Sequence, residues 1–277
     1  MRRFVRGATV LITGAGSGLG RAMALEAAAR GARIVIWDLS ASRGGAVRDE
    51  VLAAGGIALA VTVDVTDTDA VRDAAERTLA VVHGVDILIN NAGVVVGRPL
   101  LESTEAAISR TFAVNTLAPY WVTRAFLPGM VDRGRGTVVT IASAAGLIGV
   151  ARQTDYSASK HAAVGFTEAL RAEMRQLRTG VSTLLVCPYY IDTGMFAGVR
   201  TRFPLLLPIL REGTVAAAVL DAVESGRTQL SLPPLVRLLP VLRVLPVVLF
   251  DRLADVLGVN ASMDHFTGRG QDVARPT

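Results

Sequence analysis

Tyr156 and Lys160 stand four residues apart in the sequence, a short distance after Ser143. On an α-helix, side chains four residues apart lie on the same face, so this phenol and this ammonium can reach the same small volume. A tyrosine ordinarily has a pKa near ~10, and a cation within ~4–6 Å lowers that pKa because it stabilises the phenolate. The spacing therefore predicts a tyrosine that exchanges a proton near neutral pH, as a general acid or base does.

Lys160 is the only lysine of the chain, although the sequence has 29 basic residues. Arginine fills the other basic positions, and its planar fork is a poor substitute for a compact ammonium with three rotatable donors. An exposed lysine beside a core tyrosine would give the same spacing. That simpler interpretation loses weight once the glycine-rich start of the chain is considered.

A glycine-rich segment, T-G-A-G-S-G-L-G, runs from Thr13 to Gly20, between an apolar β-type run and a helical pattern that ends at Gly31. Glycines at such a turn allow the backbone to approach a diphosphate, which then lies at the positive end of the following helix. The pattern therefore predicts a dinucleotide-binding turn. The residues expected to contact the cofactor here are Gly14, Ser17, Gly18, Leu19 and Gly20.

Asp38 ends the second apolar run, about 20 residues beyond the glycines. A carboxylate at this place accepts hydrogen bonds from the adenosine ribose and repels a 2′-phosphate, which favours NAD over NADP. Arg43 lies close enough in the sequence to weaken this preference. The alternative interpretation of Asp38 is a solvated loop carboxylate.

Apolar runs and helical patterns alternate along the first two thirds of the chain. Strands are expected over residues 8–13, 33–37, 57–63, 86–90, 137–142 and 181–187, and helices over 67–82, 105–130 and 155–178. This alternation predicts a parallel sheet with helices on both faces and functional groups at the carboxyl ends of the strands. We expect one α/β domain, a doubly wound (Rossmann) sheet over residues 1–230, with an apolar C-terminal extension over residues 231–277. Pro119 predicts a kink or break in the helix over residues 105–130.

The composition is that of a folded protein with a large core, because 51% of the residues are hydrophobic and 19% are charged. The single cysteine, Cys187, excludes an internal disulfide and is typical of a reducing compartment. The net charge of +5 comes from scattered arginines, so no nucleic-acid partner is expected. The N-terminal sequence lacks the apolar core of a signal peptide. The three histidines lack the spacing of metal ligands, and we expect no metal.

Two apolar segments follow the sixth predicted strand, residues 203–210 and residues 232–257. The uncharged run from Val244 to Phe250 has seven residues, far short of the ~20 that span a bilayer. We therefore reject a spanning helix here. Three compatible interpretations remain: a lid or pocket wall over a hydrophobic substrate, a segment lying in a membrane interface, and a contact between subunits.

Three motifs occur in the order typical of the short-chain dehydrogenase/reductase family, which the chain resembles from about residue 7 to residue 197. They are T-G-x-x-x-G-x-G from Thr13 to Gly20, N-N-A-G from Asn90 to Gly93, and Y-x-x-x-K from Tyr156 to Lys160. The resemblance implies a catalytic tetrad of Asn115, Ser143, Tyr156 and Lys160.

By this resemblance, Ser143 hydrogen-bonds the reacting substrate oxygen, and Tyr156 takes the hydroxyl proton as hydride leaves for the nicotinamide. Lys160 holds the cofactor ribose and lowers the pKa of the tyrosine, and Asn115 anchors a water that relays the proton outward. Further cofactor contacts are implied for Asp64, Val65, Asn91, Ala92, Gly93, Pro188, Ile191 and Thr193.

One departure from the family pattern is informative: the segment from Cys187 to Phe196 has Tyr189 where many members have glycine. This version is similar to the retinol dehydrogenase and 17-beta-hydroxysteroid dehydrogenase branch, and the segment from Leu257 to Arg269 resembles that branch too. The resemblance implies a lipophilic substrate, such as a retinoid, a steroid or a long-chain alcohol. It also implies a homo-oligomer, a homodimer or a homotetramer. The single cysteine favours the cytoplasm, and the apolar extension is the part of the chain expected to contact a membrane peripherally.

The resulting hypothesis is an NAD(P)-dependent oxidoreductase that prefers NAD and transfers a hydride between a lipophilic alcohol or carbonyl and the nicotinamide. Two alternatives stay open. One is a carbonyl or 3-oxoacyl reductase of the same family that works with NADPH. The other is a non-catalytic nucleotide-binding scaffold that uses the apolar tail to join a membrane or a partner.

Overall fold

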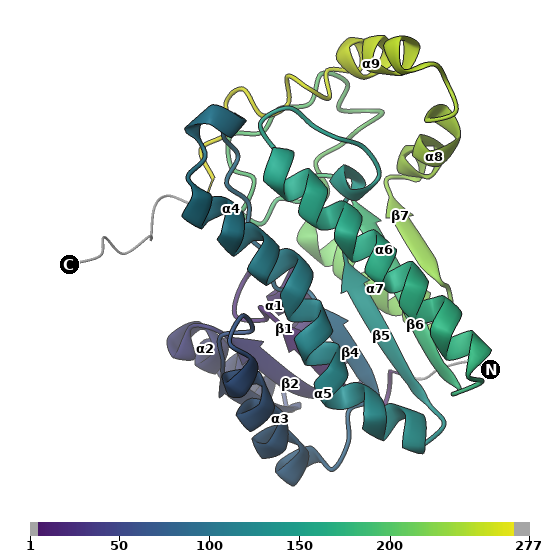
Figure 1. The fold of residues 1–277 in the computed structure, drawn as a ribbon. Coiled ribbons are helices and arrows are strands. Elements are labelled where there is room, and N and C mark those ends of the chain that lie inside the picture. The colour runs from purple at the N-terminus through teal and green to yellow at the C-terminus, as the bar shows by residue number, and fades with distance from the viewer. Residues whose placement is uncertain (1–4, 269–277) are drawn as a thin grey trace.

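A computed structural model of the protein describes residues 5–268 (Figure 1). Seven parallel strands form one sheet in the order β3-β2-β1-β4-β5-β6-β7. They are β1 (Thr9–Thr13), β2 (Arg33–Asp38), β3 (Ile57–Thr62), β4 (Ile87–Asn90), β5 (Gly136–Ile141), β6 (Val181–Pro188) and β7 (Gln229–Leu232). The chain changes direction across the sheet between β1 and β4, and parallel sheets of this kind bind ligands at that switch point. The predicted fold class is confirmed.

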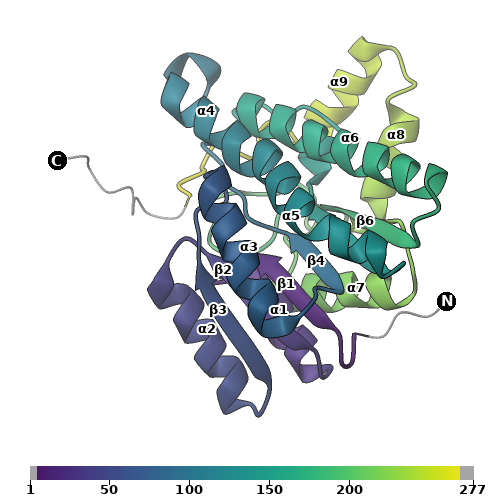
Figure 2. The ribbon, with the colours of Figure 1, turned by 60° about the horizontal axis from the view of Figure 1, so that its bottom comes forward.

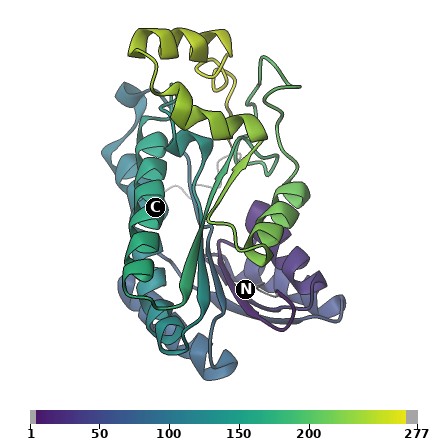
Figure 3. The ribbon, with the colours of Figure 1, turned by 90° about the vertical axis from the view of Figure 1, so that its right-hand side faces the viewer.

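Helices cover both faces of the sheet, as Figures 2 and 3 show. One face carries α1 (Gly18–Ala29), α2 (Ala41–Ala53) and α7 (Glu212–Glu224). The other carries α3 (Thr68–Val82), α4 (Glu105–Phe112), α5 (Ala118–Asp132) and α6 (Thr154–Gln176). The two layers leave the carboxyl ends of the strands as the open edge.

Side chains of β1 show why its apolar residues run without interruption. Val10 and Ile12 pack into the core beneath α1, α2 and α7, whereas Leu11 packs into the core on the opposite face. Successive strand residues point to opposite faces, and a parallel sheet covered on both sides needs apolar residues at every position. The pattern is that of an interior strand, and β1 lies between β2 and β4.

The predicted helix over residues 105–130 is interrupted in the structure, one turn before the expected place. A π-helical turn, Ala113–Leu117, separates α4 from α5 and contains Asn115. Pro119 lies in the first turn of α5, where a missing N–H costs little because no carbonyl of the helix needs it. The break therefore comes at Asn115 and the proline starts a new helix.

The elements that were not predicted from the sequence include α2, α7 and β7. β7 has only four residues and pairs with the end of β6, Pro188 beside Leu232. It spans the boundary that was expected between residues 230 and 231. The first residues of that extension therefore belong to the sheet.

Two short helices, α8 (Leu239–Leu242) and α9 (Val247–Val256), lie at the end of the molecule where the strands terminate (Figures 1 and 3). They pack over an apolar cluster that includes Tyr156, Tyr190 and Met263. No helix between residues 5 and 268 has the length and apolar character needed to cross a membrane. Residues 269–277, the last part of the predicted extension, lie outside the described residues.

Candidate active site

A cavity of about 790 Å³ opens at the carboxyl ends of the strands. It runs from the glycine-rich turn to Tyr156 and on to the C-terminal extension. The sequence-predicted residues that line it are Gly14, Ser17, Leu19, Gly20, Asp38, Asp64, Val65, Asn91, Ala92, Gly93, Ser143, Tyr156, Lys160, Pro188, Ile191 and Thr193. Two predicted residues, Gly18 and Asn115, are not part of its lining.

The glycine-rich turn approaches its neighbours too closely for any side chain at Gly20. A Cβ there would stand 2.3 Å from the carbonyl oxygen of Gly14 and 2.6 Å from Nδ2 of Asn91. Gly14 itself has a φ of +64°, which L side chains rarely adopt. The turn thus places backbone N–H groups and the start of α1 against the cavity, which fits the diphosphate of a dinucleotide.

Asp38 lines the cavity beside the glycine-rich turn. Its Oδ2 accepts a hydrogen bond from the N–H of Gly16 at 2.8 Å, and its Oδ1 accepts one from the N–H of Ser40 at 2.9 Å. The carboxylate is buried, so it is not the solvated loop residue of the alternative interpretation. Arg43 approaches Oδ1 to 3.8 Å from a largely exposed position.

Thr13 explains why the first and second motifs belong together. Its Oγ1 accepts hydrogen bonds from the backbone N–H groups of Asn91 and Ala92, both at 3.0 Å. In return, Nδ2 of Asn91 donates to the carbonyl oxygen of Thr13 at 2.9 Å. These bonds join the ends of β1 and β4 at the switch point. Sequence reasoning gave Thr13 no role, although it is the first letter of the motif.

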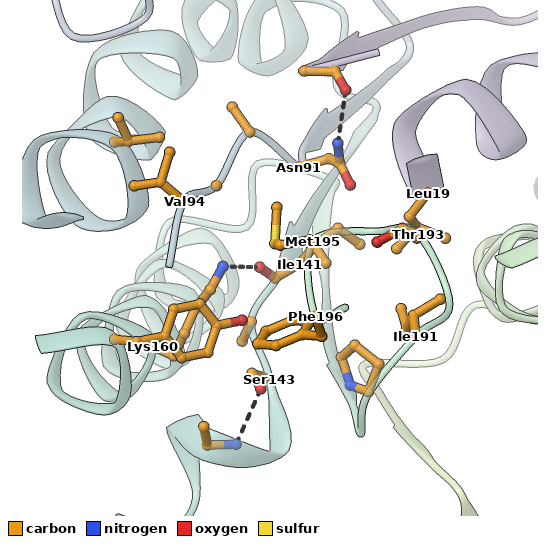
Figure 4. A pocket seen from close by; sticks show the side chains of 18 of the residues that line it. Leu19, Asn91, Val94, Ile141, Ser143, Lys160, Ile191, Thr193, Met195 and Phe196 are labelled. Carbon is orange, nitrogen blue, oxygen red and sulfur yellow. Dashed lines mark hydrogen bonds between the residues drawn. The ribbon is translucent and has the colours of Figure 1, made fainter. Parts of the chain in front are cut away.

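Ser143 and Lys160 point into the same part of the cavity (Figure 4), and Tyr156 lines it with them. Ser143 follows β5, and its Oγ accepts a hydrogen bond from the N–H of Ala145 at 3.1 Å. Tyr156 and Lys160 lie on α6 and are 5% and 4% exposed. Nζ of Lys160 donates to the carbonyl oxygen of Ile141 at 2.8 Å and lies 5.7 Å from the centre of the Tyr156 ring.

Burial governs the acidity of this pair. It raises the pKa of the Tyr156 phenol, while the nearby Ser143 hydroxyl acts in the opposite direction. It also lowers the pKa of Lys160 to about 8, since a charged ammonium is costly in an apolar environment. In this arrangement burial raises the tyrosine pKa instead of lowering it as expected, and Nζ of Lys160 points to a carbonyl oxygen.

Asn115 lies outside the lining of the cavity and hydrogen-bonds to Val94, which lines it, and to Ser159 of α6. Its Oδ1 accepts from the N–H of Val94, and its Nδ2 donates to the carbonyl of Val94, each at 2.9 Å. Nδ2 also donates to Oγ of Ser159 at 3.0 Å, and Ser159 donates to the carbonyl oxygen of Tyr156 at 2.8 Å. The side-chain amide is thus occupied by the protein. The expected relay water would need another group of this turn.

The far end of the cavity is apolar and aromatic. The ring of Phe196 lies 5.8 Å from that of Tyr156 and 5.1 Å from that of Tyr190, edge to face in both cases. Leu239, Leu242, Leu257 and Val259 of the extension complete the wall. Sequence reasoning gave no site role to the lining residues Val94, Gln153, Met195 and Phe196. No local pattern could have found them, because their only common property is the wall they share.

Family comparison agrees with this geometry. The family described as short chain dehydrogenase matches residues 8–202. The chain belongs to the short-chain dehydrogenase/reductase family. It is accordingly an oxidoreductase that acts on CH–OH groups with NAD(P), and the glycine turn and Asp38 fit that cofactor.

Several relatives carry retinoid names. The chain is 40% identical to mouse epidermal retinol dehydrogenase 2 over 271 residues, which cover 97% of this chain and 88% of the relative. It is 37% identical to bovine short-chain dehydrogenase/reductase family 16C member 6, over 97% and 86%. It is also 37% identical to human retinol dehydrogenase 10, over 95% and 85%. The resemblance to the retinol dehydrogenase branch is therefore confirmed.

Two solved structures share the fold. One is a short-chain dehydrogenase/reductase from Burkholderia phymatum in complex with NAD, at a TM-score of 0.78 and 30% identity over 87% of this chain and 93% of that one. The other is a metagenomic short-chain oxidoreductase in complex with NADP, at a TM-score of 0.70 and 30% identity over 83% and 97%.

Proposed function

We propose that this protein oxidises the hydroxyl group of a lipophilic, retinoid-like alcohol and that it uses NAD. The observation that carries the proposal is the position of Tyr156, at the junction between the dinucleotide cleft and an apolar chamber. The retinoid names of its relatives support the same substrate class. Steroids and long-chain alcohols have the same chemistry and belong in the same screen.

The residues around the reacting carbon have separate roles in this proposal. Ser143 holds the substrate oxygen, and Tyr156 takes the hydroxyl proton as a general base. Bound NAD supplies the hydride acceptor. Lys160 offers a buried ammonium within one helical turn of the phenol, and Asn115 keeps that turn in place through Ser159.

Tyr156→Phe tests these roles. The change removes only the hydroxyl, so the cofactor should still bind while turnover falls by about a thousandfold. NADH formation is followed by absorbance with a panel of retinol, steroid and long-chain alcohols. Tyr120→Phe, on a surface of α5, is the matched control and should keep wild-type rates. Wild type without turnover on any alcohol, or full activity in Tyr156→Phe, contradicts the proposal.

Asp38 supports the preference for NAD. A buried carboxylate fixed by two backbone N–H groups suits ribose hydroxyls and opposes a 2′-phosphate. Wild type should therefore bind NADH more tightly than NADPH, and Asp38→Ser should reverse the order. Arg43 favours the alternative, an NADPH-dependent carbonyl or 3-oxoacyl reductase, because its guanidinium could pair with a phosphate. Tighter binding of NADPH by wild type would establish that alternative.

Peripheral membrane contact is the second part of the proposal. Exposed apolar side chains occur on α8, on α9 and on the loop over residues 203–209, including fully exposed Leu205 and 85% exposed Val244. These segments lie at one end of the molecule (Figures 1 and 3). Residues 193–211 and 226–250 hold six arginines and no acidic residue. That composition suits anionic lipid headgroups with apolar side chains in the acyl boundary.

Vesicle flotation tests this contact. The protein should float with phosphatidylcholine vesicles that contain phosphatidylserine, and less with phosphatidylcholine alone. Leu205→Ser combined with Val244→Ser should reduce flotation, whereas Leu177→Ser combined with Val81→Ser should not, because those exposed residues lie on α3 and after α6. Equal flotation of all forms would remove the membrane from the proposal. A cytoplasmic protein with such a face should divide between the soluble and membrane fractions of cells.

We further propose a homodimer or homotetramer assembled through α5 and α6, as the family pattern implies. Light scattering coupled to gel filtration measures the mass. A monomer at micromolar concentration would contradict the assembly and would leave the catalytic proposal intact.

A further inference from the structure

Residues 151–153, immediately before the catalytic helix α6, are held by the C-terminal extension. The N–H of Ala151 donates to Oδ1 of Asn260 at 3.4 Å. Arg152 pairs with Asp264, with Nε and Oδ1 3.3 Å apart. Both contacts are near the surface, so each contributes little by itself. The two contacts share one feature: successive residues just before α6 bind residues 260–264 of the extension.

A buried chain of hydrogen bonds makes the third and strongest contact. Nε2 of Gln153 donates to Oη of Tyr190 at 3.1 Å, and Oη lies 2.8 Å from Oγ of Ser262. The three side chains are 1%, 7% and 2% exposed. Oγ of Ser262 in turn reaches the carbonyl oxygen of Val259 at 2.6 Å. All three side chains are therefore shielded from bulk solvent.

Only one set of donors satisfies this chain. The hydroxyl of Ser262 donates to the carbonyl of Val259, which accepts only. Tyr190 must therefore donate to Ser262, and its oxygen is left to accept from the amide of Gln153. The tyrosine hydroxyl is the central link, and its removal leaves a donor on one side and an acceptor on the other without a partner.

Gln153 connects the chain to the reacting groups. It is the residue that precedes α6, and its carbonyl oxygen accepts from the N–H of Ser157 at 2.7 Å. Tyr156 lies in this first turn, one residue before Ser157. A shift of Gln153 would tilt the turn that carries the phenol, and misplacement by ~1 Å is costly in catalysis.

The other end of the chain faces the substrate. Leu257 and Val259 line the cavity, and Met263 packs in the same apolar cluster as Tyr156. An apolar substrate tail that fills this end contacts the segment that contains Ser262. The same segment, residues 257–264, therefore lines the cavity and holds the start of α6.

We propose that Tyr190 and Ser262 are positioning residues through which the C-terminal extension, closed by the tail of the substrate, sets the first turn of α6 and hence Tyr156. The inference rests on the proposed oxidation of a lipophilic alcohol. Binding energy from the remote tail then appears in kcat, since it is used to orient the reacting groups. A purely structural role for the same residues would change thermal stability and leave kcat equally sensitive to tail length.

The test compares a short and a long primary alcohol, butanol and dodecanol, in wild type and variants. For wild type, kcat should be higher with dodecanol. In Tyr190→Phe and in Ser262→Ala, kcat with dodecanol should fall about tenfold, towards the butanol value, while the ratio of the two KM values changes by less than about threefold. Ser262→Thr keeps the hydroxyl and should restore kcat. Ser225→Ala, which removes a serine bonded to its own helix end, and Tyr120→Phe are the controls.

Amide hydrogen exchange over residues 153–160 provides a readout that does not need turnover. Exchange should be faster in Tyr190→Phe and Ser262→Ala than in wild type, and NADH affinity should be unchanged. Faster exchange with no turnover on any alcohol would reject the proposed function and support the grip on α6. Unchanged exchange, or an intact dependence of kcat on tail length in both variants, would overturn the inference.

Discussion

The two ends of the cavity are built in different ways. At the cofactor end, backbone meets backbone: Gly20 lies against the carbonyl of Gly14, and Thr13 joins β1 to β4 through main-chain N–H groups. At the substrate end, the wall consists of side chains from short helices, and contacts such as Gln153 to Tyr190 are between side chains. The first end has no freedom to change, whereas the second can accept many sequences.

This difference matches what each end must recognise. A diphosphate has a fixed shape and charge, and backbone N–H groups bind it whatever the neighbouring side chains are. An alcohol substrate varies in length and outline, so its wall must be made of replaceable apolar groups. We therefore expect substitutions at the cofactor end to cost more than those in the extension, and the following predictions test that order.

Gly20→Ala should have the largest effect. The new Cβ would stand 2.3 Å from the carbonyl of Gly14, so the turn must open and NADH affinity should fall by about a hundredfold. NADH fluorescence titration measures the change. Gly45→Ala in α2 is the matched control, because a Cβ there meets nothing within 4 Å. Wild-type affinity in Gly20→Ala would show that the close approach is not required.

Lys160, where the two ends meet, should give a stability effect that depends on pH. Its folded pKa of about 8 lies below the ordinary 10.5, so the unfolded chain holds more protons between these values and stability rises with pH across them. Lys160→Met should be more stable than wild type at pH 7, by up to about 3 kcal/mol, although inactive.

Urea unfolding near neutral pH and at pH 10.5 measures the difference in free energy of unfolding between Lys160→Met and wild type. It should shrink as the pH rises, because wild type then loses the cost of a buried ammonium. Burial raises the pKa of Cys187 to about 12, and Lys160 acts in the opposite direction, so this thiol stays protonated in the folded protein over most of that pH range. If the difference in free energy of unfolding did not change with pH, the buried ammonium of Lys160 would not destabilise the folded protein.

Arg243→Ala should have a smaller effect, confined to the substrate end. Nη1 of Arg243 donates to the carbonyl of Leu147 at 2.9 Å and lies 3.4 Å from Nε2 of His161, and so ties the end of α8 to the catalytic helix. The contact is exposed, so KM for dodecanol should rise by about threefold with NADH affinity unchanged. Exposed Arg237→Ala is the control, and an equal rise there would assign the effect to net charge.

Val248→Ser should change stability least, by no more than about 0.5 kcal/mol. Val248 in α9 is 62% exposed and Val81 in α3 is 61% exposed, so Val81→Ser is a matched control. Thermal unfolding should not distinguish the two variants. Binding to anionic vesicles should, with a loss of about tenfold for Val248→Ser alone. Equal binding would separate the α9 surface from the membrane.

Much of the cofactor end could be predicted from the sequence because its determinants are local. The glycines, Asp38 and the pair of Tyr156 and Lys160 are identified by short spacings, and the helix or strand that carries each of them follows from nearby residues. The prediction that failed there was the direction of the Tyr156 pKa, which depends on burial by residues distant in sequence.

The substrate end could not be predicted in the same way. Gln153, Tyr190 and Ser262 come from three distant parts of the chain, and none of them stands in a recognisable spacing. β7 was missed because four residues at an edge give too short a pattern for periodicity to detect. The apolar tail was recognised as unusual, but its sequence does not say which of its side chains face inward.

The burial of Lys160 lowers the reactivity of the only lysine in the folded protein. Its side chain is 4% exposed, so an amine-directed acylating reagent should modify the only lysine slowly in the native state. Unfolding exposes this amine to the reagent. The rate of acylation at Lys160, separated from that of the α-amine by peptide mapping, would therefore report how often the chain opens.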